Sequence, residues 1–97
     1  YTPVPFLTNS HLEEIETEIV NKTLSGLIQE NIDYRGCLYF GLMLTSQGPK
    51  LLEYNCRLGD PEAQALLPMM ESDLGELLLE CAQGALQTTE IRWKQGY

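Results

Sequence analysis

Two short runs of strand-forming residues, separated by a turn, limit most strongly how this 97-residue chain can fold. Residues 37–45, CLYFGLMLT, are aromatic and aliphatic, and the run is too short for a typical buried helix. Residues 46–49, SQGP, are typical of a turn, and residues 50–57 alternate apolar and polar side chains. We therefore predict an antiparallel β-hairpin. Because two strands leave unpaired edges and the apolar run needs cover on both faces, the hairpin is expected to belong to a larger sheet.

A helical pattern precedes the hairpin. Apolar residues recur at helical spacing with glutamates between them, which predicts a helix from about residue 10 to residue 30. Ser10 and Glu13 have the spacing of a capping box, so we expect the helix to begin there.

Two further helices are predicted after the hairpin. Asp60 followed by Pro61 is a plausible helix cap, and Pro68 must interrupt or end the short helix that follows. From Asp73 the apolar spacing predicts an amphipathic helix to about residue 86, after which no element is clear. The expected fold class is α+β: an antiparallel β-hairpin with flanking helices, in one domain over residues 1–97.

Composition excludes several classes of partner. The formal net charge is −8 and the basic residues are scattered, which argues against nucleic acid. The longest nearly apolar stretch, residues 37–44, is far too short to cross a bilayer, so no membrane is expected. Three cysteines without ligand spacing fit the reduced thiols of a cytoplasmic protein.

The second predicted strand carries polar residues on one face. Glu53, Asn55 and Arg57 alternate with apolar residues and should point the same way, with neighbours about 6.6 Å apart. Carboxylate and amide oxygens suit Mg²⁺, and an arginine next to them suits a phosphoryl or carboxylate oxygen. Taken by itself, an E-x-N-x-R pattern is more typical of a surface strand whose polar face meets water, and the neighbouring residues favour the metal site.

Two glycines are expected near these residues, Gly41 inside the predicted hairpin and Gly59 just after it. Gly59 begins a tight turn, G-D-P-E, which brings Asp60 and Glu62 near the end of the same strand. Gly41 should lie about opposite Glu53, and a glycine inside a strand marks either a close approach or a twist or bulge.

Longer strings of residues carry a resemblance. YRGCLYFGLML and GPKLLEYNCRLGDPEAQALLPMMESDL closely resemble the glycinamide ribonucleotide synthetase (phosphoribosylamine–glycine ligase) family, with N-C-R-x-G-D-P-E as the most specific part. The likeness runs from Tyr1 to about Trp93. It implies that residues 1–97 are the C-terminal portion of an incomplete ATP-grasp domain.

The resemblance implies a function and a set of site residues. The parent would be a cytoplasmic ATP-dependent ligase of purine biosynthesis, joining phosphoribosylamine to glycine through an acyl phosphate. Glu53 and Asn55 match the residues that hold Mg²⁺ or Mn²⁺ on the ATP phosphates, and Arg57 matches an arginine near the transferred phosphate. The family's turn at the substrate end of the cleft is matched by Gly59, Asp60 and Glu62.

The resemblance also shows what this segment lacks. The family's glycine-rich phosphate loop and nucleotide lysines precede it, so the remaining ATP-grasp and N-terminal domains are expected partners and the isolated chain is expected to be inactive. Two alternatives stay open: another ATP-grasp ligase, such as a subunit that activates bicarbonate, and a stand-alone, non-catalytic acidic binding module. The first usually has a different string after N-x-R, often with a histidine.

Overall fold

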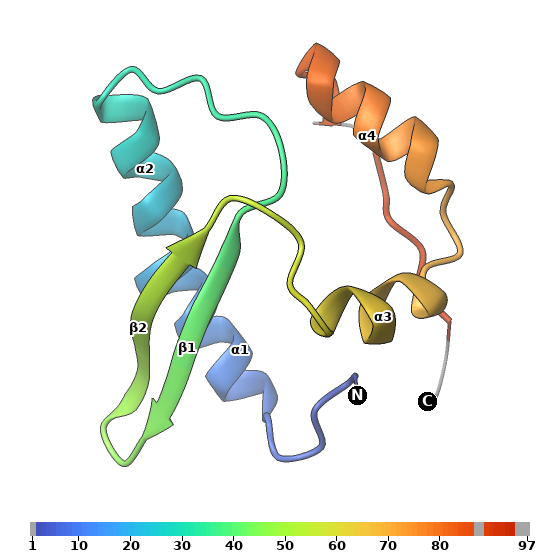
Figure 1. The fold of residues 1–97 in the computed structure, drawn as a ribbon. Helices are drawn as coiled ribbons and strands as arrows, with labels where there is room; N and C mark the ends of the chain where they lie inside the picture. The colour runs from blue at the N-terminus through green and yellow to red at the C-terminus, as the bar shows by residue number, and fades with distance from the viewer. Residues whose placement is uncertain (1, 87–88, 95–97) are drawn as a thin grey trace. The chain divides into compact units, whose positions relative to one another are not determined.

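A computed structural model of the chain describes residues 2–86 and 89–94. In order, its elements are α1 (Asn9–Ile15), η1 (Glu16–Val20), α2 (Asn21–Gln29), β1 (Tyr39–Thr45), β2 (Gly48–Asn55), α3 (Glu62–Leu66), η2 (Leu67–Met69) and α4 (Leu74–Gln83) (Figure 1). The described residues form two compact units. The hairpin unit comprises residues 4–34 and 40–55, and the α3–α4 unit comprises residues 2–3, 35–39, 56–86 and 89–94.

The predicted first helix is present, but it begins with a different cap. Thr8 is the N-cap: its hydroxyl accepts the His11 N–H at 3.3 Å, and its own N–H donates to His11 Nδ1 at 3.3 Å. The predicted capping box of Ser10 and Glu13 is therefore wrong, because Ser10 already lies within the first turn. A reciprocal pair two residues earlier satisfies two N–H groups at this helix end, those of Thr8 and His11.

A π-helical segment, η1, lies in the middle of this helix and was not predicted. It spans Glu16–Val20 between the two α-helical parts. Ile19, one of the two buried hydrophobic residues in the described part of the chain, belongs to it. The wider π-helical turn shifts the register of the apolar face. The helical spacing of apolar residues therefore holds within α1 and within α2, and is interrupted where η1 joins them.

The hairpin is confirmed, with different strand ends. β1 and β2 form a two-stranded sheet joined by Ser46 and Gln47 (Figure 1). β2 begins at Gly48, whose φ of 90° favours glycine, and it ends at Asn55, two residues before the predicted end. The Thr45 side chain closes the turn: it donates to the Gly48 carbonyl at 2.8 Å and accepts the Gln47 N–H at 3.1 Å.

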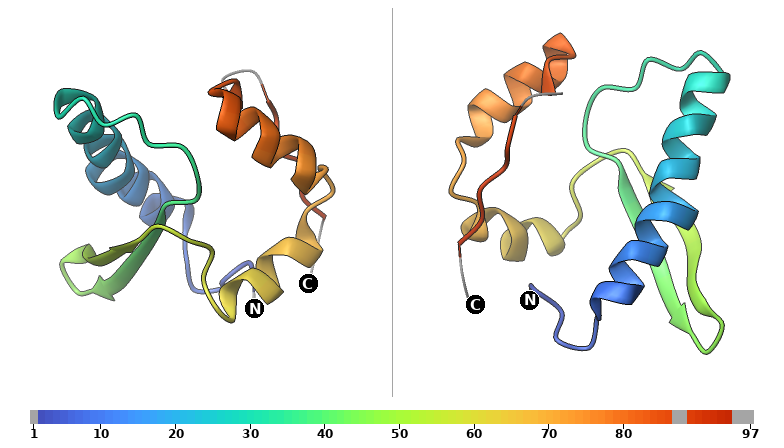
Figure 2. Two further views of the ribbon diagram at one scale, coloured as in Figure 1. Left: turned by 45° about the horizontal axis from the view of Figure 1, so that its top comes forward. Right: turned by 180° about the vertical axis from the view of Figure 1, so that it is seen from behind.

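Tyr54 joins the hairpin to the helix beside it. Its ring meets Phe40 edge to face, with ring centroids 5.5 Å apart, and its hydroxyl lies 2.8 Å from the Thr23 hydroxyl of α2. Figures 1 and 2 show this helix running alongside the hairpin. Since side chains alternate along a strand, Glu53 and Asn55 belong to the opposite face of β2.

The α3–α4 unit is held together partly by the chain that follows α4. The Glu71 N–H donates to the Arg92 carbonyl at 2.9 Å, and the Lys94 N–H donates to the Met69 carbonyl at 2.7 Å. The sequence predicts no clear element after residue 86. In the described part of that segment, residues 89–94, one isolated bridge joins Trp93 to Met70.

The last helix, α4, has well-defined ends. Asp73 is its N-cap and accepts the Glu76 N–H at 3.0 Å. The helix ends at Gln83 because Gly84 takes the left-handed conformation, with φ of 70°, so the predicted end near residue 86 was too late. The interruption predicted at Pro68 is confirmed, because α3 ends at Leu66 and is followed by a short 3-10 helix, η2, that contains Pro68.

Arg35 stabilises the C-terminal end of α4. Its guanidinium donates to the Ala82 carbonyl at 2.8 Å, where free carbonyl groups and the helix dipole favour a cation. We expect Arg35→Met to destabilise α4 by about 1 kcal/mol, seen as faster amide hydrogen exchange over residues 77–83 of the full-length protein. Lys22→Met is the control, since Lys22 forms an exposed pair with Glu18, and it should leave α4 unchanged. Unchanged α4 exchange in Arg35→Met would show that the bond contributes nothing.

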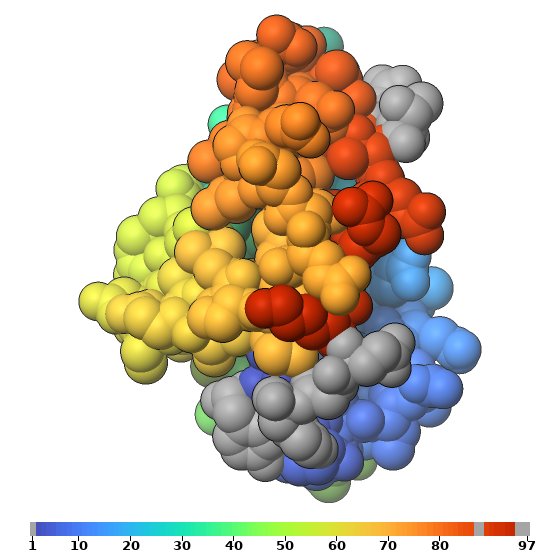
Figure 3. Space-filling model, turned by 90° about the vertical axis from the view of Figure 1, so that its right-hand side faces the viewer, coloured from blue at the N-terminus to red at the C-terminus, as the bar shows by residue number. Residues whose placement is uncertain are grey.

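The core is small and much apolar surface is exposed. Ile19 and Leu77 are the buried hydrophobic residues in the described segments, whereas Ile28 is 75% exposed and Leu52 is 63% exposed. Figure 3 shows side chains of α3 and α4, in yellow and orange, at the surface of their own unit. The α+β class is confirmed, and the exposed apolar side chains fit part of a larger domain. Among the described helices, none has the length and apolar character needed to span a membrane.

Candidate functional site

The two predicted metal ligands lie together on β2. Glu53 and Asn55 are two residues apart, and the Asn55 side-chain amide donates to Glu53 Oε1 at 3.1 Å. This bond confirms that the two side chains share a face, as strand alternation predicts. Glu53 is exposed and Asn55 is half-buried, so the pair is open to a ligand.

Gly41 lies directly across from Glu53. A Cβ atom added to Gly41 would stand 2.8 Å from Glu53 Cγ and 3.6 Å from Glu53 Oε1. The expected opposition of these residues is confirmed. The close approach at Gly41 comes from the side chain of Glu53, which lies across the neighbouring strand.

Arg57 does not continue the polar face of the strand. β2 ends at Asn55, the chain bends at residues 56–57, and the Arg57 guanidinium donates to the Leu58 carbonyl at 3.0 Å. The prediction that Arg57 lies in the strand beside the other two residues is wrong, because the alternation of strand side chains stops at the bend. Arg57 belongs to the α3–α4 unit, and Glu53 and Asn55 belong to the hairpin unit.

Each carboxylate of the G-D-P-E turn has a partner inside its own unit. Asp60 Oδ1 accepts from the Gln64 side-chain amide at 2.8 Å, and Glu62 Oε1 accepts the Tyr39 hydroxyl at 3.2 Å. The other carboxylate oxygen of Glu62, Oε2, occupies the space that a Cβ atom on the buried Gly59 would need. The turn therefore presents two exposed carboxylates, each with one side-chain hydrogen bond.

The structure corrects the expected helix cap at this turn. Pro61 occupies the N-cap position of α3 and provides no side-chain cap, while Asp60 bonds the side chain of Gln64. Sequence reasoning missed both partners of the turn. The i, i+4 spacing of Asp60 and Gln64 was a usable signal. Tyr39 is distant in sequence and gave no local signal.

The donor set on β2 fits a hard divalent cation. It offers a carboxylate and an amide whose oxygen atoms suit Mg²⁺ or Mn²⁺. Within residues 2–86 and 89–94, no three His, Cys, Asp or Glu residues gather in a way that could hold a metal. Two protein oxygens are enough for Mg²⁺, which usually keeps waters and takes phosphate oxygens from a nucleotide.

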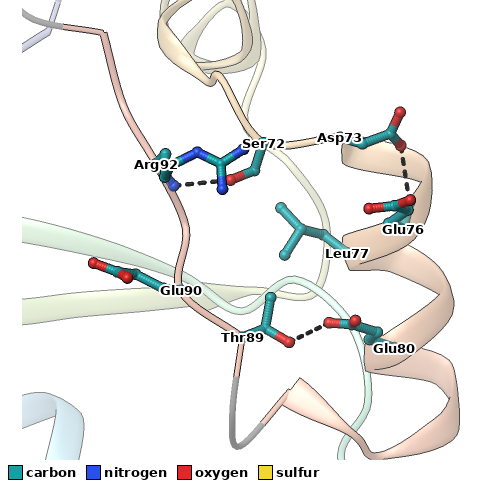
Figure 4. A pocket seen from close by; sticks show the side chains of 8 residues that line it. All are labelled: Ser72, Asp73, Glu76, Leu77, Glu80, Thr89, Glu90 and Arg92. Atoms are coloured by element: carbon teal, nitrogen blue, oxygen red, sulfur yellow. Dashed lines mark hydrogen bonds between the residues drawn. The ribbon is translucent and has the colours of Figure 1, made fainter.

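A polar pocket in the α3–α4 unit lies apart from these residues in the sequence. The Arg92 N–H donates to Ser72 Oγ at 2.8 Å at one side, and the Thr89 hydroxyl donates to Glu80 at the other (Figure 4). Its lining consists of Ser72, Asp73, Glu76, Leu77, Glu80, Thr89, Glu90 and Arg92. None of the predicted site residues lines it.

Comparison with known families agrees with the hairpin and its polar strand. Residues 1–63 match the family model described as "Phosphoribosylglycinamide synthetase, ATP-grasp (A) domain", so these elements are part of an ATP-grasp domain. Because the match covers most of the chain, the chain belongs to the phosphoribosylglycinamide synthetase family. The predicted family is confirmed.

Curated relatives cover nearly the whole chain. It is 44% identical over 96 residues to the trifunctional purine biosynthetic protein adenosine-3 of Drosophila melanogaster, covering 99% of this chain and 7% of that protein. The human protein of the same name is 42% identical over 97 residues, covering 100% of this chain and 10% of that protein. The phosphoribosylamine–glycine ligase of Caldanaerobacter subterraneus is 42% identical over 92 residues, covering 95% of this chain and 22% of that protein. The chain thus spans a small part of each relative.

Proposed function

We propose that this chain is part of a cytoplasmic ATP-dependent carboxylate–amine ligase that joins phosphoribosylamine to glycine in purine biosynthesis. One observation supports this most: a carboxylate and an amide meet on the polar face of β2, within the family's E-x-N-x-R sequence. The family match also favours this reaction over that of another ATP-grasp ligase. Residues 1–97 would be one incomplete domain, with the rest of the ATP-grasp domain and an N-terminal domain supplied by the same protein.

In this proposal Glu53 and Asn55 hold the divalent metal. When bound, Mg²⁺ or Mn²⁺ would offset the negative charge of the ATP phosphates. The Asn55 amide donates its N–H to Glu53, which leaves its Oδ1 as an acceptor for a cation. Glu53 contributes the negative charge of the pair, so its loss should weaken metal binding more than the loss of Asn55.

Arg57 and the turn act on the reacting groups. The Arg57 guanidinium has five N–H donors and uses one on the Leu58 carbonyl, so its others can bind oxygens of the transferred phosphoryl group. The carboxylates of Asp60 and Glu62 would contribute to binding substrate. Gly59 would leave room for the Glu62 side chain, which occupies the space of a Cβ at that position. Carboxylates bind amino groups, and both proposed substrates carry an amino group.

The proposed reaction has two steps. A carboxylate oxygen of glycine attacks the γ-phosphorus of ATP, the bond to the bridging oxygen breaks, and ADP leaves. The amine nitrogen of phosphoribosylamine then attacks the carbonyl carbon of the acyl phosphate. The C–O bond breaks, phosphate leaves with an oxygen that came from glycine, and the nitrogen loses a proton to give the amide.

The path of that oxygen tests the function. The full-length protein would be given ATP, phosphoribosylamine and glycine labelled with ¹⁸O in its carboxylate, and the released phosphate analysed by mass spectrometry. We expect ¹⁸O in the phosphate and ADP formation that requires glycine. Unlabelled phosphate, or ADP formed equally fast without glycine, would contradict the proposed reaction.

A further inference from the structure

We infer that Gly41 is a positioning residue for Glu53, which needs the space that a side chain at Gly41 would fill. The inference rests on the proposed function, because Glu53 is there a ligand of the metal. Gly41 itself has no side chain and would touch neither metal nor substrate. It would act through the orientation of the Glu53 carboxylate.

Backbone conformation does not explain the glycine at this position. Gly36, Gly48 and Gly84 have positive φ angles between 70° and 143°, which side chains rarely adopt, but the φ of Gly41 lies outside that region. An L-residue could therefore take the backbone of Gly41 without strain. What excludes a side chain is space, because its Cβ would stand 2.8 Å from Glu53 Cγ.

The space over Gly41 lets Glu53 reach Asn55. The Glu53 side chain lies across Gly41, and its Oε1 accepts the Asn55 amide at 3.1 Å. An alanine at residue 41 would push Glu53 Cγ aside, since contacts below 3.0 Å are essentially never seen for a real Cβ. Glu53 is exposed and can turn toward solvent, so the carboxylate would leave its place beside Asn55.

This geometry predicts that Gly41→Ala weakens metal binding and leaves the fold intact. The fold should survive, because Glu53 can move and because glycine inside a strand is less favourable than alanine. We expect the melting temperature to stay within about 2 °C of wild type, or to rise. Metal affinity should fall roughly 10–100-fold, the usual effect of disturbing a group that orients a ligand.

The test uses Mn²⁺ as the probe and the full-length protein. Free and bound Mn²⁺ are separated by electron paramagnetic resonance during titration with a non-hydrolysable ATP analogue present, and each variant is melted in parallel. The variants are Gly41→Ala, Glu53→Ala and the double change. Gly26→Ala in α2 is the matched control, because a Cβ there meets nothing within 4 Å. It should leave Mn²⁺ affinity unchanged.

The double variant separates positioning from packing. If Gly41 acts through Glu53, the double variant should bind Mn²⁺ no more weakly than Glu53→Ala alone. Wild-type affinity in Gly41→Ala, additive losses in the double variant, or an early melt of Gly41→Ala would each overturn the inference. Wild-type affinity in Glu53→Ala would instead show that Glu53 does not bind the metal, which would refute the proposed metal site itself. The two failures are therefore distinguishable.

Discussion

Asn55→Ala in the full-length protein should lower the turnover number by about 10²–10³. The change removes one of two proposed metal ligands, which misplaces the charge that offsets the transferred phosphate. Its effect on stability should stay within about 1 kcal/mol. Asn55 is only half-buried, and the bond it loses is to the exposed side chain of Glu53. Initial rates of ADP formation at saturating substrates, measured beside thermal denaturation, give both quantities.

Asn21→Ala is a suitable control for that experiment. Asn21 is an exposed asparagine in α2 and has no role in the proposed reaction, so its removal should change neither rate nor stability appreciably. If Asn55→Ala melted early but kept its rate per folded molecule, Asn55 would be a structural residue. The metal assignment would then be wrong.

Tyr54→Ala should have the opposite profile, with a loss of about 2–3 kcal/mol in stability and little change in the rate per folded molecule. The ring contacts Phe40, and the hydroxyl bonds Thr23 of α2. The loss is smaller than the 3–5 kcal/mol typical of truncating a buried aromatic side chain, because Tyr54 is 48% exposed. The midpoint of chemical denaturation and the rate after correction for unfolded protein measure the two effects.

Tyr54→Phe separates the two contacts. It keeps the ring against Phe40 and removes the bond to Thr23, so we expect a loss of about 1 kcal/mol. Full stability in Tyr54→Ala together with a large loss of rate would mean that the two faces of β2 had been assigned the wrong way round.

The sequence was a good guide to elements whose signal is local. The alternation in β2 placed Glu53 and Asn55 on one face, and the bond between them bears this out. The apolar spacing after Asp73 marked α4, and Pro68 marked the end of α3. Each depends on residues a few positions apart, where backbone geometry decides which side chains share a face.

The ends of helices and strands were harder to predict from the sequence, because several nearby residues could satisfy the same backbone groups. Thr8 with His11 caps the first helix, although Ser10 with Glu13 has the spacing of a capping box. The end of β2 at Asn55 likewise removed Arg57 from the strand face.

Contacts between distant parts of the chain had no signal in the sequence. The bond from Tyr39 to Glu62 joins residues 23 apart, and the bond from Arg35 to Ala82 joins residues 47 apart. Spacing rules describe neighbours along an element and say nothing of such pairs. The hydrogen-bond partner of Glu62 and the cation at the C-terminal end of α4 could therefore be identified only from the structure.

We propose that Glu53 and Asn55 together hold the metal that binds the ATP phosphates. This assignment can be tested with a crystal structure of the full-length protein with Mn²⁺ and a non-hydrolysable ATP analogue, in which anomalous data locate the manganese. We predict an anomalous peak about 2.1–2.2 Å from a Glu53 carboxylate oxygen and from Asn55 Oδ1, with phosphate oxygens completing the shell. Manganese bound to the nucleotide but out of reach of both side chains would contradict the claim.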